Sequence, residues 1–322
     1  MELKKVYALV QDGLDGVDRE FRMLVDSQQD FPEMQRMLAQ IMVGGKVVRP
    51  TLVFLCGSLF GGSRDRLHLM ALASEIMHIA TLVHDDAIDS AYLRRGRATI
   101  NSTWGVDMAV LLGDFLFATA GSYAARTDNI RVVSLFTQTL GIIASGEIKQ
   151  SFSSFRLPQT MEQYLDRIAG KTAALFAMST RSGAILGSAP EESVNILGDY
   201  GYNLGLAFQV VDDVLDFVGT EHEVGKPVGA DLAQGTLTLP SLKLLEQYPA
   251  DNPVEKVFRH EDSEENIRRA IEMVRASGII DQCYHTAADY AKKACRRLPE
   301  LPDMPAREAL YSLADYVIKR QK

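Results

Sequence analysis

Hydrophobic positions recur along this chain with the period of an α-helix. Ala, Leu, Met, Ile and charged residues return at intervals of three and four in most segments, whereas sustained two-residue alternation is rare. The prolines fall mostly near the boundaries of these segments, as at Pro32, Pro50, Pro158, Pro190 and Pro249. The pattern predicts an all-α protein, with a last helix from Ala306 to Lys319.

One stretch lacks this periodicity. Residues Gly219 to Gly235 are rich in glycine and charge, which indicates a long loop, and loops of that length are often functional. No linker or low-complexity tract divides the chain elsewhere. We therefore expect residues 1–322 to form a single all-α domain, a bundle of about a dozen helices.

Composition and charge narrow the functional classes. The chain has 322 residues, 47% of them hydrophobic, which is enough to bury a large core. A net charge of −8 gives no sign of nucleic-acid binding, whereas local clusters of acidic residues suggest metal ions. Cys56, Cys283 and Cys295 form no C-x-x-C pair, so neither a disulfide framework nor a zinc site is expected.

Cysteine usage and the amino-terminal sequence predict a cytoplasmic protein. The first residues lack the apolar stretch of a signal peptide. The longest apolar-rich run, Thr51 to Phe60, is too short to span a bilayer and predicts a buried helix. A reducing compartment fits the sparse cysteines best.

Two D-D-x-x-D triplets stand inside apolar helical stretches, formed by Asp85, Asp86 and Asp89 and by Asp212, Asp213 and Asp216. Carboxylates four residues apart share one face of a helix, and like charges there are unfavourable unless cations compensate. Mg²⁺ binds carboxylate oxygens together with substrate phosphate oxygens, so facing triplets would hold a diphosphate through bridging metals. A solvated acidic face is the weaker alternative, because the motif occurs twice beside basic residues.

Diphosphates also need direct cationic contacts, and basic residues lie near the triplets. The candidates are Lys46, Arg49, Arg94, Arg95, Lys171 and Lys226. His78 lies two turns before Asp85 on the same helix face, where a diphosphate donor and an ordinary core histidine both remain open. His84, next to the triplet, is expected to have a structural role.

Several of these segments together resemble the trans-isoprenyl diphosphate synthases, also called polyprenyl synthetases, over nearly the whole chain. The resemblance rests on ordered motifs at Gly45–Pro50, Asp85–Gly96, Gly146–Gln150, Lys171–Thr172, Phe208–Asp213 and Gly225–Leu232. It implies an all-α fold around a central cavity and a homodimer. It also implies three Mg²⁺ ions, with Mn²⁺ as a substitute, and isopentenyl and allylic diphosphates as substrates.

The resemblance assigns roles to the motif residues. Asp85, Asp89 and Asp212 would ligate Mg²⁺, supported by Asp86, Asp213 and Asp216. The allylic diphosphate would be contacted by Arg94, Lys171 and Lys226, and the isopentenyl diphosphate by Lys46, Arg49, His78 and Arg95. Thr172 and Gln209 would lie near the developing carbocation. Two positions depart from the family pattern. Family members often carry arginine where this chain has Val47, and lysine where it has Thr236. The second difference removes one potential diphosphate contact.

Product length depends on the residues that line the path of the growing tail. Met77, Ala80 and Thr81 lie one to two turns before Asp85. In the family, bulky aromatic residues at positions 80 and 81 would stop growth early. Their absence predicts a product longer than C20, with geranylgeranyl (C20) diphosphate as the alternative. The cavity floor would then be formed by Phe115, Phe117 or Phe136, unless these are ordinary core residues.

Two other functional classes, a terpene cyclase and a non-catalytic synthase subunit, fit the sequence less well. A terpene cyclase of the same fold would carry Asn or Ser in its second metal motif and would not require Lys46 and Arg49. A non-catalytic subunit of a heterodimeric synthase should have lost triplet aspartates, whereas all six are present. A catalytic subunit that needs a partner remains open. At most transient membrane contact is expected, for release of an apolar product.

Overall fold

The computed structural model describes residues 3–42, 47–94, 96–219 and 228–320. Nearly all regular structure in these residues is helical, which confirms the predicted all-α class. The β-structure in the described residues is one hairpin of two short strands, in which β1 (Leu93–Arg94) pairs antiparallel with β2 (Arg97–Ala98). The described part of the chain has more helices than the expected dozen, because several helices, such as α13 (Ala230–Ala233), are a single turn long.

The chain divides into two compact units, each assembled from separate stretches of sequence. Unit 1 comprises Met1–Thr139, Leu175–Gly201 and Cys295–Leu313, and unit 2 comprises Leu140–Ala174, Tyr202–Ala294 and Ala314–Lys322. Two of the boundaries fall inside the long helices α8 (Ile130–Ser153) and α11 (Glu191–Val218), so no linker marks them. A single domain over residues 1–322 therefore stays a prediction.

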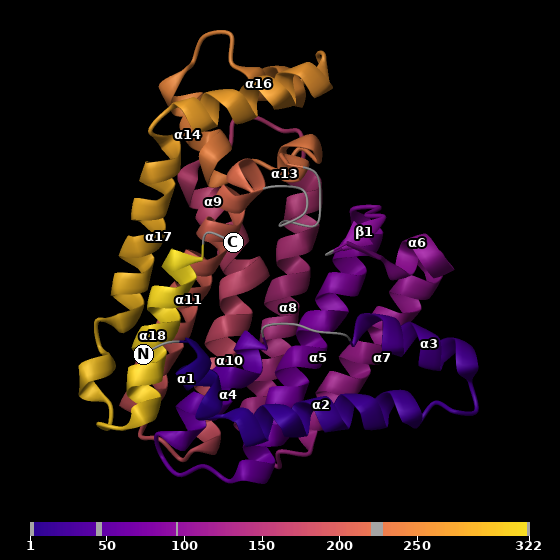
Figure 1. Cartoon of the computed structure of the whole chain (residues 1–322), viewed down its shortest axis with the longest axis vertical. Helices are drawn as coiled ribbons and strands as arrows, with labels where there is room; N and C mark the ends of the chain where they lie inside the picture. Colours follow the sequence, from indigo (N-terminus) through magenta and orange to yellow (C-terminus); the bar gives the residue numbers. More distant parts are fainter. Residues whose placement is uncertain (1–2, 43–46, 95, 220–227, 321–322) are drawn as a thin grey trace. The chain divides into compact units, whose positions relative to one another are not determined.

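Unit 1 is built around two long helices that pack along each other, α5 (Arg64–Ile88) and α7 (Val106–Ala125) (Figure 1). Its other helices are α1 (Leu3–Ala8), α2 (Gln11–Asp26), α3 (Pro32–Ile41), α4 (Val48–Ser58), α6 (Ile100–Trp104), most of α10 (Ala174–Leu186), η2 (Leu298–Glu300) and the starts of α8, α11 and α18 (Pro305–Lys319). The range of α18 agrees with the predicted last helix. Residues Pro50 to Gly57 of α4 are all buried, as predicted for Thr51–Phe60. A Cβ at Gly183 would lie 2.4 Å from the carbonyl oxygen of Val53, so α4 and α10 approach closely only because glycine stands there.

By length and composition alone, α5 and α7 are long and apolar enough to cross a membrane. From the sequence, only the shorter run Thr51–Phe60 was considered as a possible span. In α5, 61% of the most apolar window is buried inside the protein, and the last turn carries two aspartates. This is the pattern of a core helix. In α7 only 39% of the corresponding window is buried.

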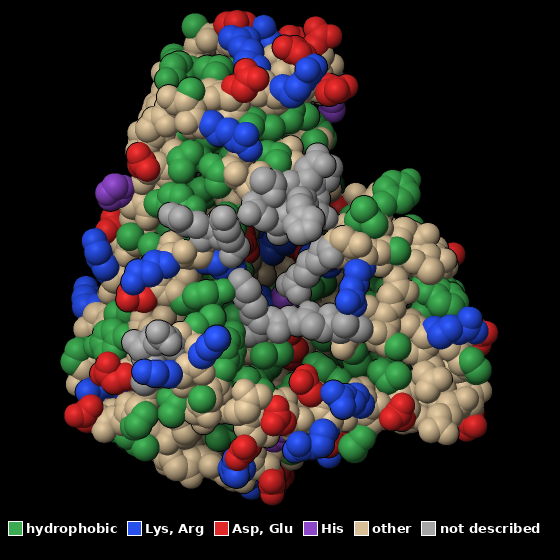
Figure 2. Space-filling view, in the orientation of Figure 1, with side chains coloured by type: hydrophobic (Ala, Val, Ile, Leu, Met, Phe, Trp, Pro, Cys, Tyr) green, Lys and Arg blue, Asp and Glu red, His purple; other side chains and the backbone are tan. Residues whose placement is uncertain are grey.

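Unit 2 has its own hydrophobic core, which includes Tyr164, Val214 and Phe217. Its elements are parts of α8 and α11, α9 (Met161–Ile168), the π-helix η1 (Ala169–Ala173), α13, α14 (Leu239–Gln247), α15 (Pro253–Phe258), α16 (Ser263–Ala276) and α17 (Ile279–Cys295). In Figure 1, α16 lies across the end of α14, and Figure 2 shows basic and acidic side chains interspersed on it. The turn α13 lies inside the predicted loop Gly219–Gly235, where fully buried Leu232 anchors it.

Candidate active site

The first aspartate triplet lies at the carboxyl end of α5. Asp85 and Asp86 are in its last turn, and Asp89 is the C-cap, whose N–H donates to the Asp85 carbonyl at 2.8 Å. Asp85 is half-buried and Asp89 is exposed, whereas Asp86 is buried. Asp85 and Asp89, which are predicted to bind metal, are therefore one helical turn apart and accessible. The third aspartate of the triplet, Asp86, is buried.

Arg94 satisfies the buried carboxylate of Asp86. Its Nε donates to both carboxylate oxygens, at 2.8 and 2.9 Å, and its Nη2 lies 2.8 Å from Oδ1. Burial raises the pKa of Asp86 above its ordinary value, although the bonds to Arg94 act in the opposite direction. The β1–β2 hairpin returns Arg94 to the helix end, and Thr99 fixes the hairpin by donating to the Ala91 carbonyl at 2.6 Å.

In the second triplet, on α11, the burial pattern differs. The Asp212 side chain is 37% exposed, whereas Asp213 and Asp216 are buried. The Oδ2 of Asp216 accepts the backbone N–H of Asp231 at 3.3 Å, and its carbonyl accepts the N–H of Gly229 at 2.9 Å. Asp216 therefore ties the segment after residue 227 to α11, and Asp212 is the carboxylate left accessible.

A chain of hydrogen bonds holds Asp213. Tyr164 donates to its Oδ2 at 2.7 Å, and the Gln209 side-chain amide donates to its Oδ1 at 2.9 Å. Thr172 in turn donates to the Gln209 amide oxygen at 2.6 Å. Burial raises the pKa of Asp213 to about 6, although the bonds from Gln209 and Tyr164 oppose this effect. The structure thus links Thr172 and Gln209, which were predicted to lie together near the carbocation, to Asp213 of the second triplet.

Lys171 and Thr172 lie in the π-helix η1, a distortion that often marks functional sites. The Lys171 ammonium pairs with the Glu147 carboxylate of α8 at 2.7 Å, and the two side chains are 29% and 15% exposed. Glu147 belongs to the predicted motif Gly146–Gln150. This half-buried ion pair gives that motif a physical task, which is to position the lysine of the next motif.

The carboxylates of each unit fit the chemistry of Mg²⁺. Among the described residues, no group of three or more His, Cys, Asp or Glu side chains is arranged to hold an ion by itself. Mg²⁺ does not need such a cage, because it binds through one or two carboxylates plus water and substrate phosphates. Asp85 and Asp89, accessible and one turn apart, supply that kind of partial ligand set.

Comparison with known proteins agrees with this arrangement. The model of the polyprenyl synthetase family matches residues 31–274. The chain belongs to the polyprenyl synthetase family. It is accordingly a trans-prenyltransferase.

Relatives match this synthase along almost its full length. Heptaprenyl diphosphate synthase component 2 of Bacillus subtilis (strain 168) is 35% identical over 322 residues, 100% of this chain and 92% of the relative. The structure of polyprenyl synthase from Caulobacter crescentus CB15, complexed with calcium and isoprenyl diphosphate, has a TM-score of 0.92 at 35% identity and covers 100% of this chain and 98% of that one. Decaprenyl diphosphate synthase from Rhodobacter capsulatus has a TM-score of 0.90 at 34% identity, covering 99% of each chain.

Two residues that contact the synthase's second triplet, Tyr164 and Arg320, were not predicted from the sequence. Tyr164 stands in the amphipathic helix α9, and its position on the apolar face was its only signal. Arg320 directly follows α18 and is 8% exposed. Its guanidinium forms an ion pair with Asp212 and lies 4.1 Å from the ring centroid of Phe208.

Other predicted substrate residues are partly buried in unit 1. The Arg49 guanidinium lies 5.0 Å from the ring centroid of Phe176, and His78 is half-buried in α5. The Nε2 of His84 lies 3.0 Å from the Val110 carbonyl, and a Cβ on Gly113 would clash with its ring, in line with a structural role. Three predicted ligands lie outside the described residues, namely Lys46, Arg95 and Lys226.

The residues predicted to set product length have different environments within unit 1. Met77 and Ala80 are fully buried, and Thr81 is half-buried with its hydroxyl bonded to the His78 carbonyl at 2.7 Å. Phe136 is 2% exposed and lies against Gly121, whereas Phe115 and Phe117 are half-buried. The ring of Phe117 also meets that of His84 edge-on, at a centroid distance of 5.4 Å. Their role in chain length stays a prediction.

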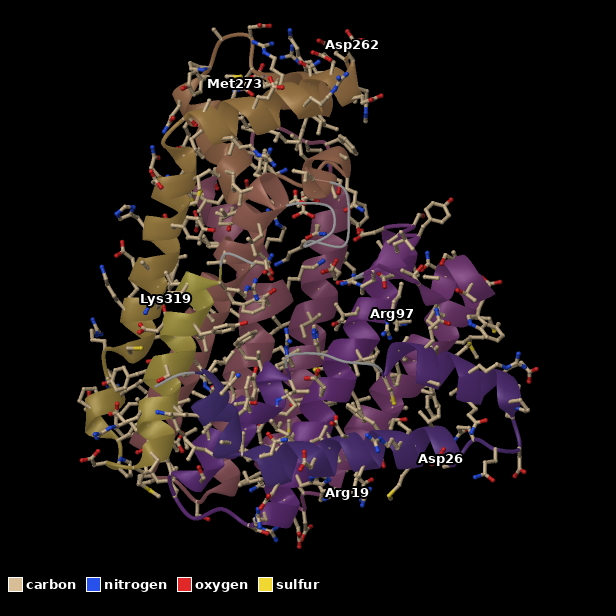
Figure 3. The ribbon with its side chains drawn as sticks, in the orientation of Figure 1. Arg19, Asp26, Arg97, Asp262, Met273 and Lys319 are labelled. Atoms are coloured by element: carbon tan, nitrogen blue, oxygen red, sulfur yellow. The ribbon has the colours of Figure 1, made fainter. Side chains whose placement is uncertain are left out.

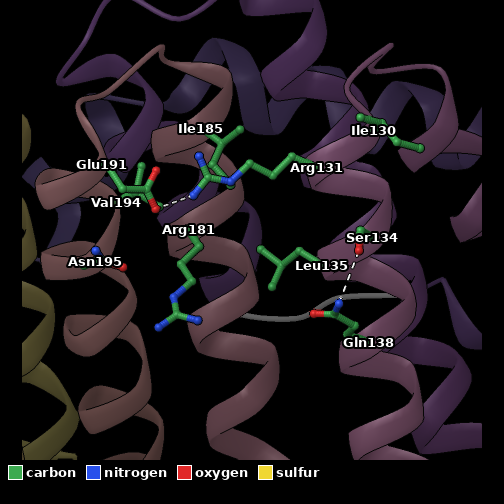
Figure 4. A pocket seen from close by; sticks show the side chains of 10 residues that line it. All are labelled: Ile130, Arg131, Ser134, Leu135, Gln138, Arg181, Ile185, Glu191, Val194 and Asn195. Atoms are coloured by element: carbon green, nitrogen blue, oxygen red, sulfur yellow. Dashed lines mark hydrogen bonds and ion pairs between the residues drawn. The ribbon is translucent and has the colours of Figure 1, made fainter.

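A separate pocket of about 460 Å³ lies in unit 1, between the start of α8, the end of α10 and the start of α11 (Figure 4). Arg131 pairs with Glu191 at 2.6 Å and holds the pKa of that carboxyl below its ordinary value. Gln138 donates to Ser134 at 3.2 Å. None of the residues predicted to bind substrate lines this pocket, whose lining is Ile130, Arg131, Ser134, Leu135, Gln138, Arg181, Ile185, Glu191, Val194 and Asn195.

Proposed function

We propose that this prenyltransferase uses Mg²⁺ to condense an allylic diphosphate with isopentenyl diphosphate, head to tail and in trans, and makes a polyprenyl diphosphate longer than C20. The observation that carries the proposal is common to both triplets. In each, protein donors satisfy a buried aspartate, Asp86 or Asp213, while a neighbouring carboxylate, Asp85 or Asp212, stays accessible. A solvent-accessible carboxylate beside a neighbour that the protein holds in place suits a metal ligand.

Asp85, Asp89 and Asp212 act as the Mg²⁺ ligands in this proposal. Together with the substrate, these residues would hold three ions, and Mn²⁺ could replace Mg²⁺ there. Bound Mg²⁺ would stabilise the charge on the departing diphosphate. Asp86, Asp213 and Asp216 support the metal cluster, directly or through water, and the observed bonds of all three hold them in place for that task.

The chain's own cations complete the diphosphate site. Arg94, Lys171 and Lys226 contact the allylic diphosphate, and Lys46, Arg49, His78 and Arg95 bind isopentenyl diphosphate. The Lys171–Glu147 and Arg94–Asp86 pairs support this role, because each limits the directions in which the cation can point. Such preorganised charge stabilises the leaving group without reorganisation during the reaction.

Thr172 and Gln209 face the developing carbocation in this proposal. The bond from Thr172 to the Gln209 oxygen fixes both side chains, and the oxygen of the Thr172 hydroxyl retains its lone pairs. The isopentenyl double bond then attacks the held cation, for which positioning supplies much of the rate. The released diphosphate takes the proton that ends the step.

A product longer than C20 is supported by the small side chain of Ala80. Ala80 is fully buried five residues before Asp85, about 7.5 Å along the helix axis, at a position where the family resemblance implies that a bulky aromatic residue would stop growth early. Relatives named heptaprenyl and decaprenyl diphosphate synthases match nearly the whole chain. The alternative is a geranylgeranyl (C20) diphosphate synthase.

The synthase acts as a homodimer in this proposal. The outer face of α7 leaves apolar residues exposed at its amino-terminal end, with Leu111 59% and Val106 51% exposed. Exposed apolar surface of this kind marks interaction sites, and a second copy of the chain is the partner that the family favours. The Bacillus subtilis relative is named component 2, which makes a distinct partner subunit the alternative.

We place the enzyme in the cytoplasm, with at most transient contact with a membrane when an apolar product leaves. The three cysteines, all of which lie in the described residues, are free thiols, which fits a reducing compartment. Fractionation of cells that express the tagged chain tests this, and recovery with the membrane pellet at high salt would contradict it.

One assay tests the central proposal. The purified chain is incubated with Mg²⁺, labelled isopentenyl diphosphate and farnesyl diphosphate, and the products are dephosphorylated and sized by chromatography. We expect a ladder that ends well beyond twenty carbons. A stop at twenty would support the geranylgeranyl alternative, and no incorporation with Mg²⁺ or Mn²⁺ would show that the chain alone is not the synthase.

A further inference from the structure

The carboxyl end of α18 is anchored on the second aspartate triplet, within unit 2. Arg320 follows the last residue of α18, and its side chain is 8% exposed. Its Nη2 pairs with Oδ1 of Asp212, and its guanidinium lies 4.1 Å from the ring centroid of Phe208, one turn before Asp212 on α11. Arginine thus makes two contacts with one face of α11, a charged one and a cation–π one.

These contacts occupy the carboxylate to which the proposed function assigns a metal. Asp212 is the triplet's accessible aspartate, because Asp213 and Asp216 are buried and bonded within the protein. The Arg320 guanidinium takes Oδ1, and its positive charge repels a cation that approaches the other oxygen. Ligation of Asp212 by a divalent cation therefore requires Arg320 to move away or to share the carboxylate at a cost.

We propose that Arg320 is a built-in competitor for the metal at Asp212, so that metal binding and release of the end of α18 from the second triplet are coupled. This inference rests on the proposed function, which makes Asp212 a metal ligand. The free energy with which the Arg320–Asp212 pair holds the end of α18 must be given up when a metal binds Asp212. By linkage, the metal therefore binds less tightly by that amount of free energy.

The chain provides a matched control one residue away. Lys319 carries the same charge in the last turn of α18 and is labelled in Figure 3. Its side chain is 78% exposed and lies 3.6 Å from Asp315 on its own helix. Loss of either side chain removes one positive charge near the end of the chain, but only Arg320 contacts Asp212.

Direct binding of Mn²⁺ in the presence of inorganic diphosphate, followed by electron paramagnetic resonance, tests the competition. We expect Arg320→Gln to bind Mn²⁺ on the order of tenfold more tightly than the wild type, because one repelling charge is gone. Lys319→Gln should stay within about twofold of the wild type, as an exposed charge is screened. Equal or weaker binding by Arg320→Gln, or binding by none of the proteins, would overturn the inference.

Two further measurements guard against a trivial explanation. Arg320→Lys keeps the charge, so its Mn²⁺ affinity should remain close to that of the wild type; a tenfold increase there would also overturn the inference. In the wild type, Mg²⁺ with inorganic diphosphate should speed amide hydrogen exchange in residues 314–320, and unchanged exchange would contradict release. If instead the wild type makes no product with Mg²⁺, the proposed function itself fails, so the two failures are distinguishable.

Discussion

The hydroxyl of Tyr164 donates a 2.7 Å hydrogen bond to Oδ2 of Asp213, and both side chains are buried. The bond joins α9 to the centre of the second aspartate triplet on α11. Arg167, one turn further along α9, lies 5.5 Å from the Tyr164 ring centroid and donates to the Leu237 carbonyl at 2.5 Å. The tyrosine is therefore contacted at its ring by Arg167 and at its hydroxyl by Asp213, which makes the hydroxyl a fixed support for the carboxylate.

Removal of that hydroxyl should affect both stability and catalysis. We expect Tyr164→Phe to lower the free energy of unfolding by about 1–3 kcal/mol, because a buried carboxylate loses a donor. The kcat should fall as well, because Asp213 and, through it, Gln209 lose their fixed geometry. Urea unfolding and steady-state kinetics measure the two effects.

Tyr200 provides the matched control for Tyr164. It is equally buried, and its hydroxyl donates at 2.7 Å to the Leu310 carbonyl in unit 1 rather than to a triplet aspartate. Tyr200→Phe should lower stability by a similar amount and leave kcat within about twofold of the wild type. Equal losses of kcat in the two variants would mean that Tyr164 acts only through general stability.

The accessible aspartate of the first triplet should be needed for metal-dependent turnover. We expect Asp85→Ala to lower kcat by at least about a hundredfold, because the diphosphate loses part of its charge stabilisation. Asp65→Ala alters an exposed carboxylate in the first turn of the same helix and should leave kcat nearly unchanged. Product formation at saturating Mg²⁺ measures both, and native turnover by Asp85→Ala would rule out its metal role.

Position 80 should control the length of the product. Ala80 is fully buried on α5, so Ala80→Phe should shorten the dominant product, at a cost of about 1–3 kcal/mol in stability from overpacking. Ala80→Ser hardly changes the volume and should keep the wild-type product. Chromatography of dephosphorylated products gives the answer, and an unchanged distribution in a folded Ala80→Phe variant would place the tail elsewhere.

The exposed apolar face of α7 should hold the dimer together. Leu111→Arg is expected to shift the protein toward monomer, because it places a charge in the proposed interface. Met23 on α2 is 57% exposed, close to the 59% of Leu111, so Met23→Arg is the control and should not alter the mass. Size-exclusion chromatography with light scattering measures the mass. A wild-type monomer, or an unaffected Leu111→Arg dimer, would contradict the proposal.

His68 should make stability depend on pH. Its ring packs against Gly16 of α2, and burial lowers its pKa below 6.5, although the nearby Glu20 opposes this. The unfolded chain therefore keeps the His68 proton to a higher pH than the folded protein does. The free energy of unfolding should rise as the pH increases from the folded pKa toward 6.5, and this gain is lost as the pH falls through the folded pKa. Urea unfolding from pH 5 to 8 should show this rise in the wild type and less of it in His68→Gln. Equal pH dependence of the two proteins would contradict it.

The sequence by itself determined the helices and the motifs. The three- and four-residue periodicity reports a buried helix face locally, so α4 and α18 could be predicted within a few residues. The triplets could be read because their chemistry lies within five consecutive positions, as in Asp85–Asp89. The same reading could not divide the chain into its two units, whose boundaries run through α8 and α11 with no change in composition.

Tertiary structure alone decided which aspartate of each triplet is buried and what satisfies it. Both triplets have the same spacing, yet Asp89, at the carboxyl end of α5, is exposed, whereas Asp216 is buried and accepts a hydrogen bond from the segment that carries Asp231. Tyr164 lies 49 positions from Asp213, and Arg320 is farther still from Asp212. No local periodicity encodes such pairings, because they form only when packing brings distant helices together.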